Sequence, residues 1–313
     1  MDVGLPDQLR WDDEFRFDDG SIVLVAGNIA FKVYKGLLAA QSMVFSDMLS
    51  TGSAHATQVV DGCPVVHLSD SPEDLRHLLR ALISKEQILV YAQDFAHAYT
   101  FDQLAALVRL SHKYGIESVE KQAISCLKTY YADTFDAWEG PKGFRAMPEV
   151  GQGIGAIRLA RLTNNPSMLP VAFYECAILG GKIVQGWTRE DGTVERLGWE
   201  DLERCINGYG ALCRMIEFRI ECLFKVEPGH TCSTRIRCKT GMRDLYADQI
   251  EFEWTTTRLL HSVADSVEKW ASDYSLCEHC AELIKERDRG ERRDLWTKLP
   301  SIFGLSVEGW DTG

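Results

Sequence analysis

The stretch Phe15–Leu49, FRFDDGSIVLVAGNIAFKVYKGLLAAQSMVFSDML, decides the fold of the N-terminal part of this chain. It contains an unbroken apolar run, Ile22–Ala26, which is too short for a core helix and rich in β-branched residues. Such a run predicts a strand that is buried on both faces. Gly27-Asn28 is a two-residue hairpin signal, and the return strand Ile29–Tyr34 alternates apolar side chains on one face.

The second part of the stretch has a helical period. Leu37 and Leu38 fall on a first short helix, and Ser42 has the side chain of an N-cap for a second one. This second helix carries Val44, Phe45, Met48 and Leu49. A hairpin that leads into two short apolar helices cannot bury its own apolar surface, so the stretch must start a larger core.

The order and spacing of these residues resemble the opening of a BTB/POZ domain. The matching positions are Phe31-Lys32-Val33-Tyr34-Lys35, Leu38-Ala39-Ala40, Ser42, Phe45 and Met48-Leu49. The segment LVRLSHKYGIESV at 107–119 also resembles the family's helical hairpin. The resemblance covers roughly 15–131 and implies an α+β fold, a small sheet with clustered helices.

Two positions depart from the family pattern. Ser21 stands where an aspartate is usual, and Tyr34 stands where a histidine is usual. In the family the aspartate contributes to a charged groove at the dimer interface. Its absence here argues against this groove and against a standard homodimer.

Capping signals continue this pattern downstream. Ser71-Pro72 opens a leucine-striped helix, Thr100 with Gln103 forms a capping box, and Gly115 is a fitting helix stop. Between these helices, Lys85–Tyr99 is irregular and aromatic and predicts a surface loop.

The sequence predicts four regions. Residues 1–14 are a polar lead-in, 15–131 the BTB/POZ domain, 132–155 a linker, and 156–313 a mainly α-helical domain with a cysteine-bearing tail. In the last region, RLARLTNNPSMLPVAFYECAIL at 158–179 resembles a segment of fungal, basidiomycete-like BTB proteins. Trp199–Phe224 is interpreted as two helices.

Three shorter patterns are interpreted structurally. The glycines of 151–156 superficially fit a dinucleotide fingerprint, but no buried strand precedes them, so we expect a flexible loop before a helix. The mixed charges of 285–293 favour a solvated helix and turn. The aromatic tail 296–305 either anchors on the helical domain, which we favour, or forms an exposed patch that binds a partner.

Composition restricts the class of protein. The formal net charge of the 313 residues is −12, which argues against nucleic acid as a partner, since phosphate binding needs a basic face. No apolar run approaches the roughly 18–20 residues of a membrane span, and the acidic N-terminus is no signal peptide. The ten cysteines are therefore expected to be reduced, in the cytoplasm or nucleus.

Four of these cysteines suggest a metal site. Cys232 and Cys238, together with Cys277 and Cys280, could close a tetrahedral structural zinc site. The alternative is ordinary buried or half-buried thiols, because Cys-x5-Cys is wider than the usual spacing and i, i+3 thiols can simply share a helix face. His230 or His279 could replace one thiol.

The function expected from the sequence is non-catalytic protein–protein interaction. No G-x-S-x-G, Walker A or H-E-x-x-H motif occurs, so we expect no catalytic residues. The resemblance implies self-association or binding to another BTB protein, and some family members are substrate adaptors of cullin-3 ubiquitin ligases. A zinc-stabilised regulatory or scaffold protein is a further alternative. The expected interaction surface comprises Val33, Tyr34, Leu37, Leu38, Phe45, Met48 and Leu49.

The cullin-3 alternative has one argument against it. Members that bind cullin-3 often carry an apolar-x-Glu element after the second short helix. The corresponding stretch here, Ser50–Pro64, which we interpret as a loop, contains no glutamate.

Overall fold

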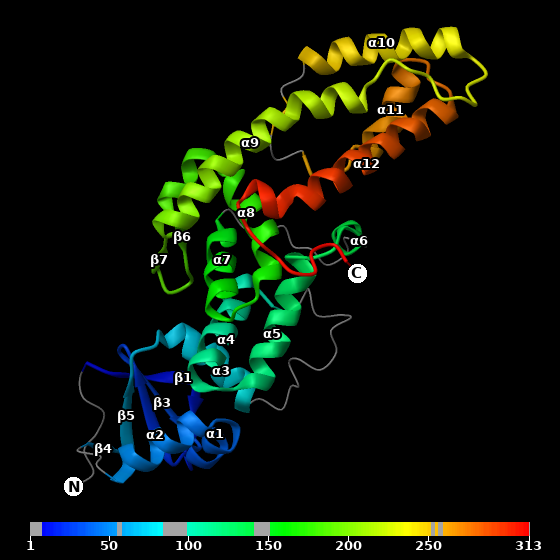
Figure 1. The fold of residues 1–313 in the computed structure, drawn as a ribbon. Helices are drawn as coiled ribbons and strands as arrows, with labels where there is room; N and C mark the ends of the chain where they lie inside the picture. Colours follow the sequence, from blue (N-terminus) through cyan, green and yellow to red (C-terminus); the bar gives the residue numbers. More distant parts are fainter. Residues whose placement is uncertain are drawn as a thin grey trace. The chain divides into compact units, whose positions relative to one another are not determined.

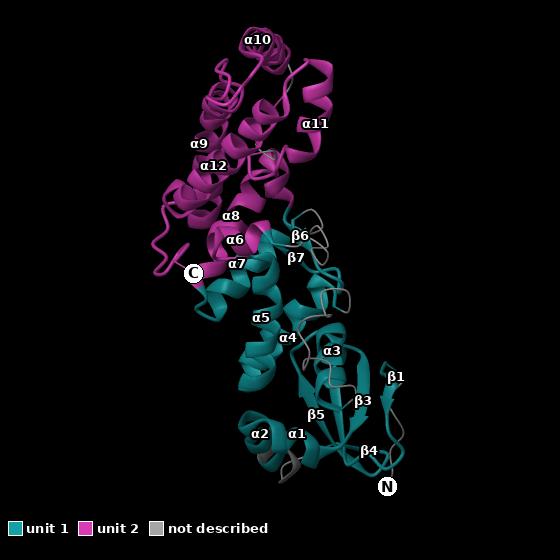
Figure 2. Ribbon diagram, turned by 90° about the vertical axis from the view of Figure 1, so that its right-hand side faces the viewer, with its two compact units in different colours: residues 1–131, 140–165, 186–195 teal, residues 132–139, 166–185, 196–313 magenta. Residues whose placement is uncertain are grey.

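The computed structural model describes residues 8–54, 58–83, 99–140, 151–251, 254–255 and 259–312. Its elements form two compact units (Figure 2). The first unit comprises Met1–Tyr131, Gly140–Asn165 and Gly186–Glu195, and the second comprises Ala132–Glu139, Pro166–Gln185 and Arg196–Gly313. The predicted domains are contiguous stretches, whereas these units interleave along the sequence.

A five-stranded sheet with the order β1-β3-β2-β5-β4 forms the start of the first unit (Figure 1). Its strands are β1 (Arg10–Arg16), β2 (Ile22–Ala26), β3 (Ile29–Val33), β4 (Val59–Val60) and β5 (Cys63–Leu68). Strand β2 lies in the centre, antiparallel to β3 and parallel to β5, and all five of its residues are buried. The predicted two-sided burial of β2 and the hairpin at Gly27, whose φ is 55°, are both confirmed.

Strand β1 was not predicted, because residues 10–14 were assigned to a polar lead-in. Most residues of β1 are charged, so the sequence does not suggest a buried strand. In the structure, Asp12 and Phe15 face inward. The Asp12 carboxylate is satisfied there by the Arg76 guanidinium, whose Nε lies 2.9 Å from Oδ2. Burial of a charged residue is tolerated when such a partner is present, which hydropathy along the sequence does not reveal.

The described helices of the first unit are α1 (Lys35–Gln41), α2 (Met43–Ala54), α3 (Pro72–Ile83), α4 (Phe101–Tyr114), α5 (Glu117–Tyr130) and α7 (Gln152–Leu162). Three of them, α2, α3 and α4, begin where the capping residues indicated. The Ser42 hydroxyl accepts from Phe45 N–H, the Ser71 hydroxyl accepts from Asp74 N–H, and Thr100 forms the capping box. Residues 50–64, interpreted as a loop, include the end of α2 and two strands. Residues 85–98 of the predicted surface loop lie outside the described residues.

Helix α7 and the hairpin of β6 (Trp187–Thr188) and β7 (Val194–Glu195) complete the first unit. The glycine-rich stretch at 151–156 is the start of α7, so the predicted loop was wrong there. Helix α7 packs closely at Gly155, where a Cβ atom would lie 2.6 Å from Trp187 Cζ3. The glycines thus serve close packing, because the ring of Trp187 occupies the space of a side chain.

Ion pairs hold the same hairpin against the helices of its unit. Asp74 of α3 is the shared acceptor: Arg109 Nη2 of α4 lies 3.0 Å from its Oδ1, and Arg189 of the hairpin pairs with its Oδ2. Glu195 of β7 in turn lies 3.2 Å from Arg158 of α7. Several partly buried pairs of this kind stabilise the hairpin more than one exposed pair does.

The second unit is helical. Its described residues form α6 (Phe135–Glu139), α8 (Leu169–Ala177), α9 (Trp199–Leu223), α10 (Arg235–Glu251), α11 (Ala264–Asp273) and α12 (Glu278–Ile302), and the 3-10 helices η3 (Pro166–Met168) and η4 (Gly180–Gln185). The expected α+β region followed by a mainly helical region is confirmed (Figure 1). The predicted break in Trp199–Phe224 was wrong, because α9 is continuous and its Gly208 allows the Phe303 ring to pack directly on the helix.

Two further differences concern the linker and the stretch 285–293, whereas the C-terminal tail agrees with the expectation. Residues 135–139, placed in a linker, form α6 with Phe135 and Trp138 buried. The aromatic tail is anchored inside the second unit, as favoured, with Trp296 and Phe303 fully buried. The stretch 285–293 is part of α12 and is not simply solvated, since Asp288 faces the interior of its unit.

Candidate metal centre and interaction surface

Four cysteine thiols come together in the second unit, all at or near the beginnings of helices. Cys232 precedes α10 and Cys238 lies in its first turn, while Cys277 is the N-cap of α12 and Cys280 lies in the first turn of that helix. All four sulfur atoms lie within 4.8 Å of one another. The Cys-x5-Cys spacing is wide because the chain between the first two cysteines turns into a helix.

The sulfur positions fit a tetrahedral ion. Four thiolates at about 2.3 Å from a zinc ion would lie about 3.8 Å apart. The Sγ atoms of Cys232 and Cys277 are 3.7 Å apart. Cys232, Cys238 and Cys280 are buried and Cys277 is half-buried. Among the described residues, only thiols make up this group, so neither His230 nor His279 contributes to it.

The surroundings of two of the thiols shift their pKa values in opposite directions. Burial raises the pKa of Cys238, but a hydrogen bond with the Thr234 hydroxyl and one from Cys277 N–H outweigh it and lower the pKa to about 7. The N–H of Cys277 lies 3.3 Å from that sulfur. Burial raises the pKa of Cys280 to about 12, so this thiol needs a neighbouring cation to exist as a thiolate at neutral pH.

A hydrophobic core encloses the cluster. Cys232, Cys238 and Cys280 are members of a group of buried side chains contributed by α9, α10, α11 and α12. Its other members are Leu223, Phe224, Met242, Leu245, Val267, Leu276, Ala281 and Ile284. Four protein thiols, three of them buried, match the ligand set of a closed structural site, in which no position is left to a substrate.

The predicted interaction surface divides into core and surface residues. Val33, Leu38, Phe45 and Leu49 are fully buried in the first unit, so a partner cannot contact their side chains directly. The other three, Tyr34, Leu37 and Met48, are half-buried.

Two exposed residues of α2 were missed by the sequence analysis. Met43 is 75% exposed and Val44 is 43% exposed. The N-cap at Ser42 could have indicated their exposure, because it fixes the start of α2. If Phe45 and Leu49 face the core, the helical period directs Met43 and Val44 outward.

The two residues that depart from the family pattern take part in local contacts. The Tyr34 hydroxyl donates to Asp19 Oδ1 at 2.7 Å, and Ser21 Oγ accepts a hydrogen bond from Lys35 N–H at 3.0 Å. The hydrogen bond with Asp19 is the main cause that raises the pKa of Tyr34. This surface is therefore polar and neutral at Ser21 and Tyr34.

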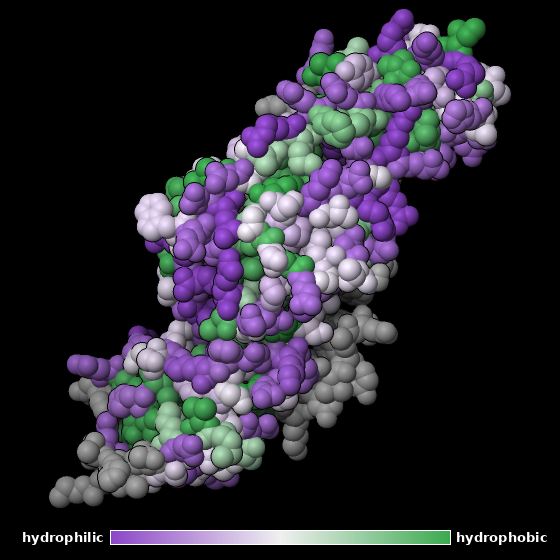
Figure 3. Space-filling view, in the orientation of Figure 1, coloured by the Kyte–Doolittle hydropathy of each residue, from purple (hydrophilic) through white to green (hydrophobic). Residues whose placement is uncertain are grey.

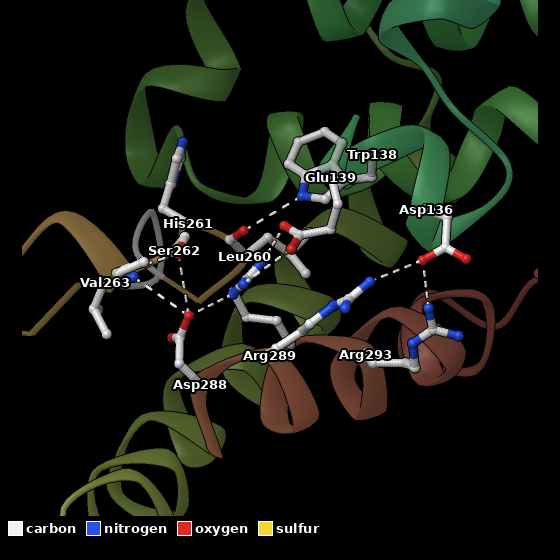
Figure 4. Close-up of polar contacts among 12 residues, drawn as sticks. Asp136, Trp138, Glu139, Leu260, His261, Ser262, Val263, Asp288, Arg289 and Arg293 are labelled. Atoms are coloured by element: carbon white, nitrogen blue, oxygen red, sulfur yellow. Dashed lines mark hydrogen bonds and ion pairs between the residues drawn. The ribbon is translucent and has the colours of Figure 1, made fainter. Parts of the chain in front are cut away.

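A buried group of charges in the second unit was not predicted (Figure 4). Asp288 of α12 accepts from Arg219 Nη2 of α9 at 2.7 Å and from Arg292 Nε at 2.9 Å. Arg292 also pairs with Glu139 of α6, and the nearby Trp138 indole donates to Leu260 O. Because Arg292 pairs with both acids and Arg219 pairs with Asp288, the group connects α6, α9 and α12 within the second unit.

Comparison with known proteins identifies one family. Residues 17–130 match the family model described as the BTB/POZ domain. No curated protein matches the chain. The family match confirms the resemblance drawn from residues 31–49.

No helix in the described parts of the chain is long and apolar enough to cross a membrane.

Proposed function

We propose that this chain, whose residues 17–130 form a BTB/POZ domain, is a non-catalytic assembly or adaptor protein. BTB/POZ domains generally mediate protein–protein interaction and self-association. The observation that supports this role most directly is the exposure of Met43 and Val44 beside the half-buried Leu37 and Met48. Figure 3 shows apolar side chains at the surface in the region of α1, α2 and the sheet.

The proposed contact is self-association, or pairing with another BTB protein, through the exposed side of α1 and α2. Solvent-exposed large apolar residues gain about 1.5–3 kcal/mol each when a partner buries them. A two-fold contact uses the same patch on both copies, so each exposed side chain contributes twice. Neither Ser21 nor Tyr34 carries a charge, so in this proposal apolar burial provides most of the affinity.

The double variant Met43→Glu/Val44→Glu should weaken self-association at least about 100-fold, because each buried carboxylate would lose its hydration. Size-exclusion chromatography with light scattering on the full chain from 1 to 100 µM measures this. Val184→Glu/Ile206→Glu, which also places two carboxylates at exposed apolar positions, is the matched control and should leave the mass unchanged. A wild-type chain that stays monomeric throughout this range would contradict self-association.

Finer assignments are part of the same proposal. The fungal type is supported by the segment 158–179, and a place in the cytoplasm or nucleus is supported by ten cysteines without a disulfide. A cullin-3 adaptor role is less well supported than assembly, since the stretch Ser50–Pro64 lacks a glutamate.

The four-cysteine cluster favours a second role, in which a structural zinc ion stabilises the helical unit as a scaffold. Its support is the mutual distance of the four sulfur atoms, within 4.8 Å. Chains purified from zinc-supplemented cells should contain one zinc per chain by elemental analysis. Cys238→Ser/Cys280→Ser should contain none, whereas Cys126→Ser, which removes a half-buried thiol elsewhere, should keep the metal. Purified wild-type protein without zinc would remove this role.

A further inference from the structure

Two thiols of the four-cysteine cluster are more accessible to solvent than the other two. Cys277 is half-buried and Cys232 is 7% exposed, whereas Cys238 and Cys280 are fully buried. Cys238 also accepts a hydrogen bond from the N–H of Cys277, and Cys280 lies among the side chains of the hydrophobic core. A small solute that approaches from the solvent therefore meets the sulfur atom of Cys277 first.

The two more accessible thiols are also in direct contact. Sγ of Cys277 lies 3.7 Å from Sγ of Cys232, although the residues are 45 positions apart in the chain. An S–S bond is about 2.0 Å long, so a shift of about 1.7 Å would join the two atoms. Cys232 precedes α10 and Cys277 is the N-cap of α12, so this shift does not have to deform the interior of a helix.

We propose that hydrogen peroxide oxidises Cys277 and Cys232 to a disulfide, and that this reaction releases the zinc ion of the structural site. The inference rests on the zinc role proposed above. The disulfide removes two of the four ligands. The two remaining thiolates, those of Cys238 and Cys280, do not complete a tetrahedral site, so the ion is lost to the solvent.

The reaction has two steps, and its atoms and electrons balance. The Cys277 thiolate attacks one oxygen of the peroxide, the O–O bond breaks, hydroxide leaves, and a sulfenic acid forms on Cys277. The Cys232 thiolate then attacks this sulfur, the S–O bond breaks, a second hydroxide leaves, and the S–S bond forms. The two sulfur atoms lose two electrons, the peroxide gains them, and zinc leaves without a change in its oxidation state.

The disulfide would hold together the same two segments that a bound ion would join. A bond between Cys232 and Cys277 connects the chain before α10 covalently to the start of α12. A cross-link over 45 positions restricts the unfolded chain. Cys238 and Cys280 then remain as buried thiols in the hydrophobic core. We therefore expect oxidation to remove the ion without unfolding the helical unit.

A second thiol pair, Cys277 and Cys280, fits this reaction less well. The two residues are three positions apart at the start of α12, a spacing that also occurs in redox-active CxxC motifs. Those motifs follow a strand in a βαβ context, whereas the element before α12 is the helix α11. Cys280 is also fully buried, so the proposed bond goes to Cys232.

The test treats the zinc-loaded full chain with millimolar hydrogen peroxide and follows two readouts in the same sample. A colorimetric zinc indicator should report one ion released per chain. Tryptic digestion without reductant should yield, at the same rate, a cross-linked pair of the peptides 226–235 and 270–285, which contain Cys232 and Cys277. Dithiothreitol should remove the cross-link and restore zinc binding.

Single variants identify the thiols that react. In zinc-free chains, Cys280→Ser should keep the cross-link after peroxide treatment, whereas Cys277→Ser should lose it, because only the second change removes the accessible sulfur. Cys222→Ser removes a half-buried thiol elsewhere in the second unit and is the matched control. This variant, loaded with zinc, should release the ion at the wild-type rate.

The thermal stability of the oxidised chain provides an independent readout. The peroxide-treated wild type should unfold at a higher temperature than the reduced chain in EDTA, because the disulfide restricts the unfolded chain and EDTA leaves no cross-link. Equal unfolding temperatures of these two zinc-free forms would contradict the bridging role of the disulfide.

Three results would overturn the inference. They are zinc that stays bound in peroxide, zinc release without the cross-link between 226–235 and 270–285, and a bond from Cys277 to Cys280 in its place. Chains that contain no zinc before the oxidant is added would contradict the structural zinc role and the release that depends on it. In such chains the cross-link would still assign the reactive thiol pair, and its absence would remove that assignment too.

Discussion

Removing zinc from the metal-loaded chain with EDTA should lower the unfolding temperature of the helical unit by about 10–20 °C, equivalent to about 5 kcal/mol. Structural zinc contributes about 10–16 kcal/mol in small zinc-finger peptides. The effect should be smaller here, because the hydrophobic core around Leu245 and Ile284 persists without the ion. Differential scanning calorimetry with and without EDTA measures the difference.

The reason for a large effect is the position of the thiols in the chain. Cys232 and Cys238 fix the start of α10, whereas Cys277 and Cys280 fix the start of α12. One bound ion would therefore join two helix starts that are far apart in sequence. Cys238→Ser should unfold at the lower temperature and should not respond to EDTA, and added zinc should restore only the wild type. A zinc-loaded wild type with the same unfolding temperature in EDTA would contradict the structural role.

Replacing Asp288 by alanine should lower the free energy of unfolding by about 3–5 kcal/mol, because the change leaves two buried guanidinium groups without their shared acceptor. Asp288 is only 1% exposed and Arg292 only 2% exposed. Burial lowers the pKa of Arg219, whereas the neighbouring charge of Asp288 raises it. Urea unfolding followed by circular dichroism measures the loss.

Two controls distinguish the buried group from an ordinary surface charge. Asp294→Ala removes an exposed carboxylate from the same helix and should change the free energy by less than about 0.5 kcal/mol. The double variant Asp288→Ala/Arg219→Met should cost less than the sum of its single changes, since one unpaired charge is removed. Equal effects of Asp288→Ala and Asp294→Ala would contradict a buried network.

Local signals made the N-terminal fold predictable. The unbroken apolar run of β2 and the caps at Ser42, Ser71 and Thr100 act over a few residues, and each marks the element that the structure has. Strand β1 was missed because the burial of Asp12 depends on its hydrogen bond with Arg76, which lies 64 positions away along the chain. The packing of α7 was missed for the same reason, since Gly155 has meaning only beside Trp187.

The candidate sites show the same limit. The four cysteines were found from their residue type, but only the fold brings their sulfur atoms within 4.8 Å. For the interaction surface, apolar residue type could not separate the buried Phe45 from the exposed Met43. Asp288 and Arg292 resemble a solvated i, i+4 pair in sequence, and their burial depends on Arg219 and Glu139, which lie far away along the chain.

The interleaved chain also affects the synthesis of the protein. When Tyr131 leaves the ribosome, the first unit still lacks α7 and the hairpin at Trp187. At translation rates of about 5–20 residues per second, residues 132–195 need roughly a further 3–13 s. During that interval the surface of α4 that α7 will cover is open to solvent. The apolar residues of α4 that α7 covers in the finished unit therefore stay exposed until translation has passed Glu195.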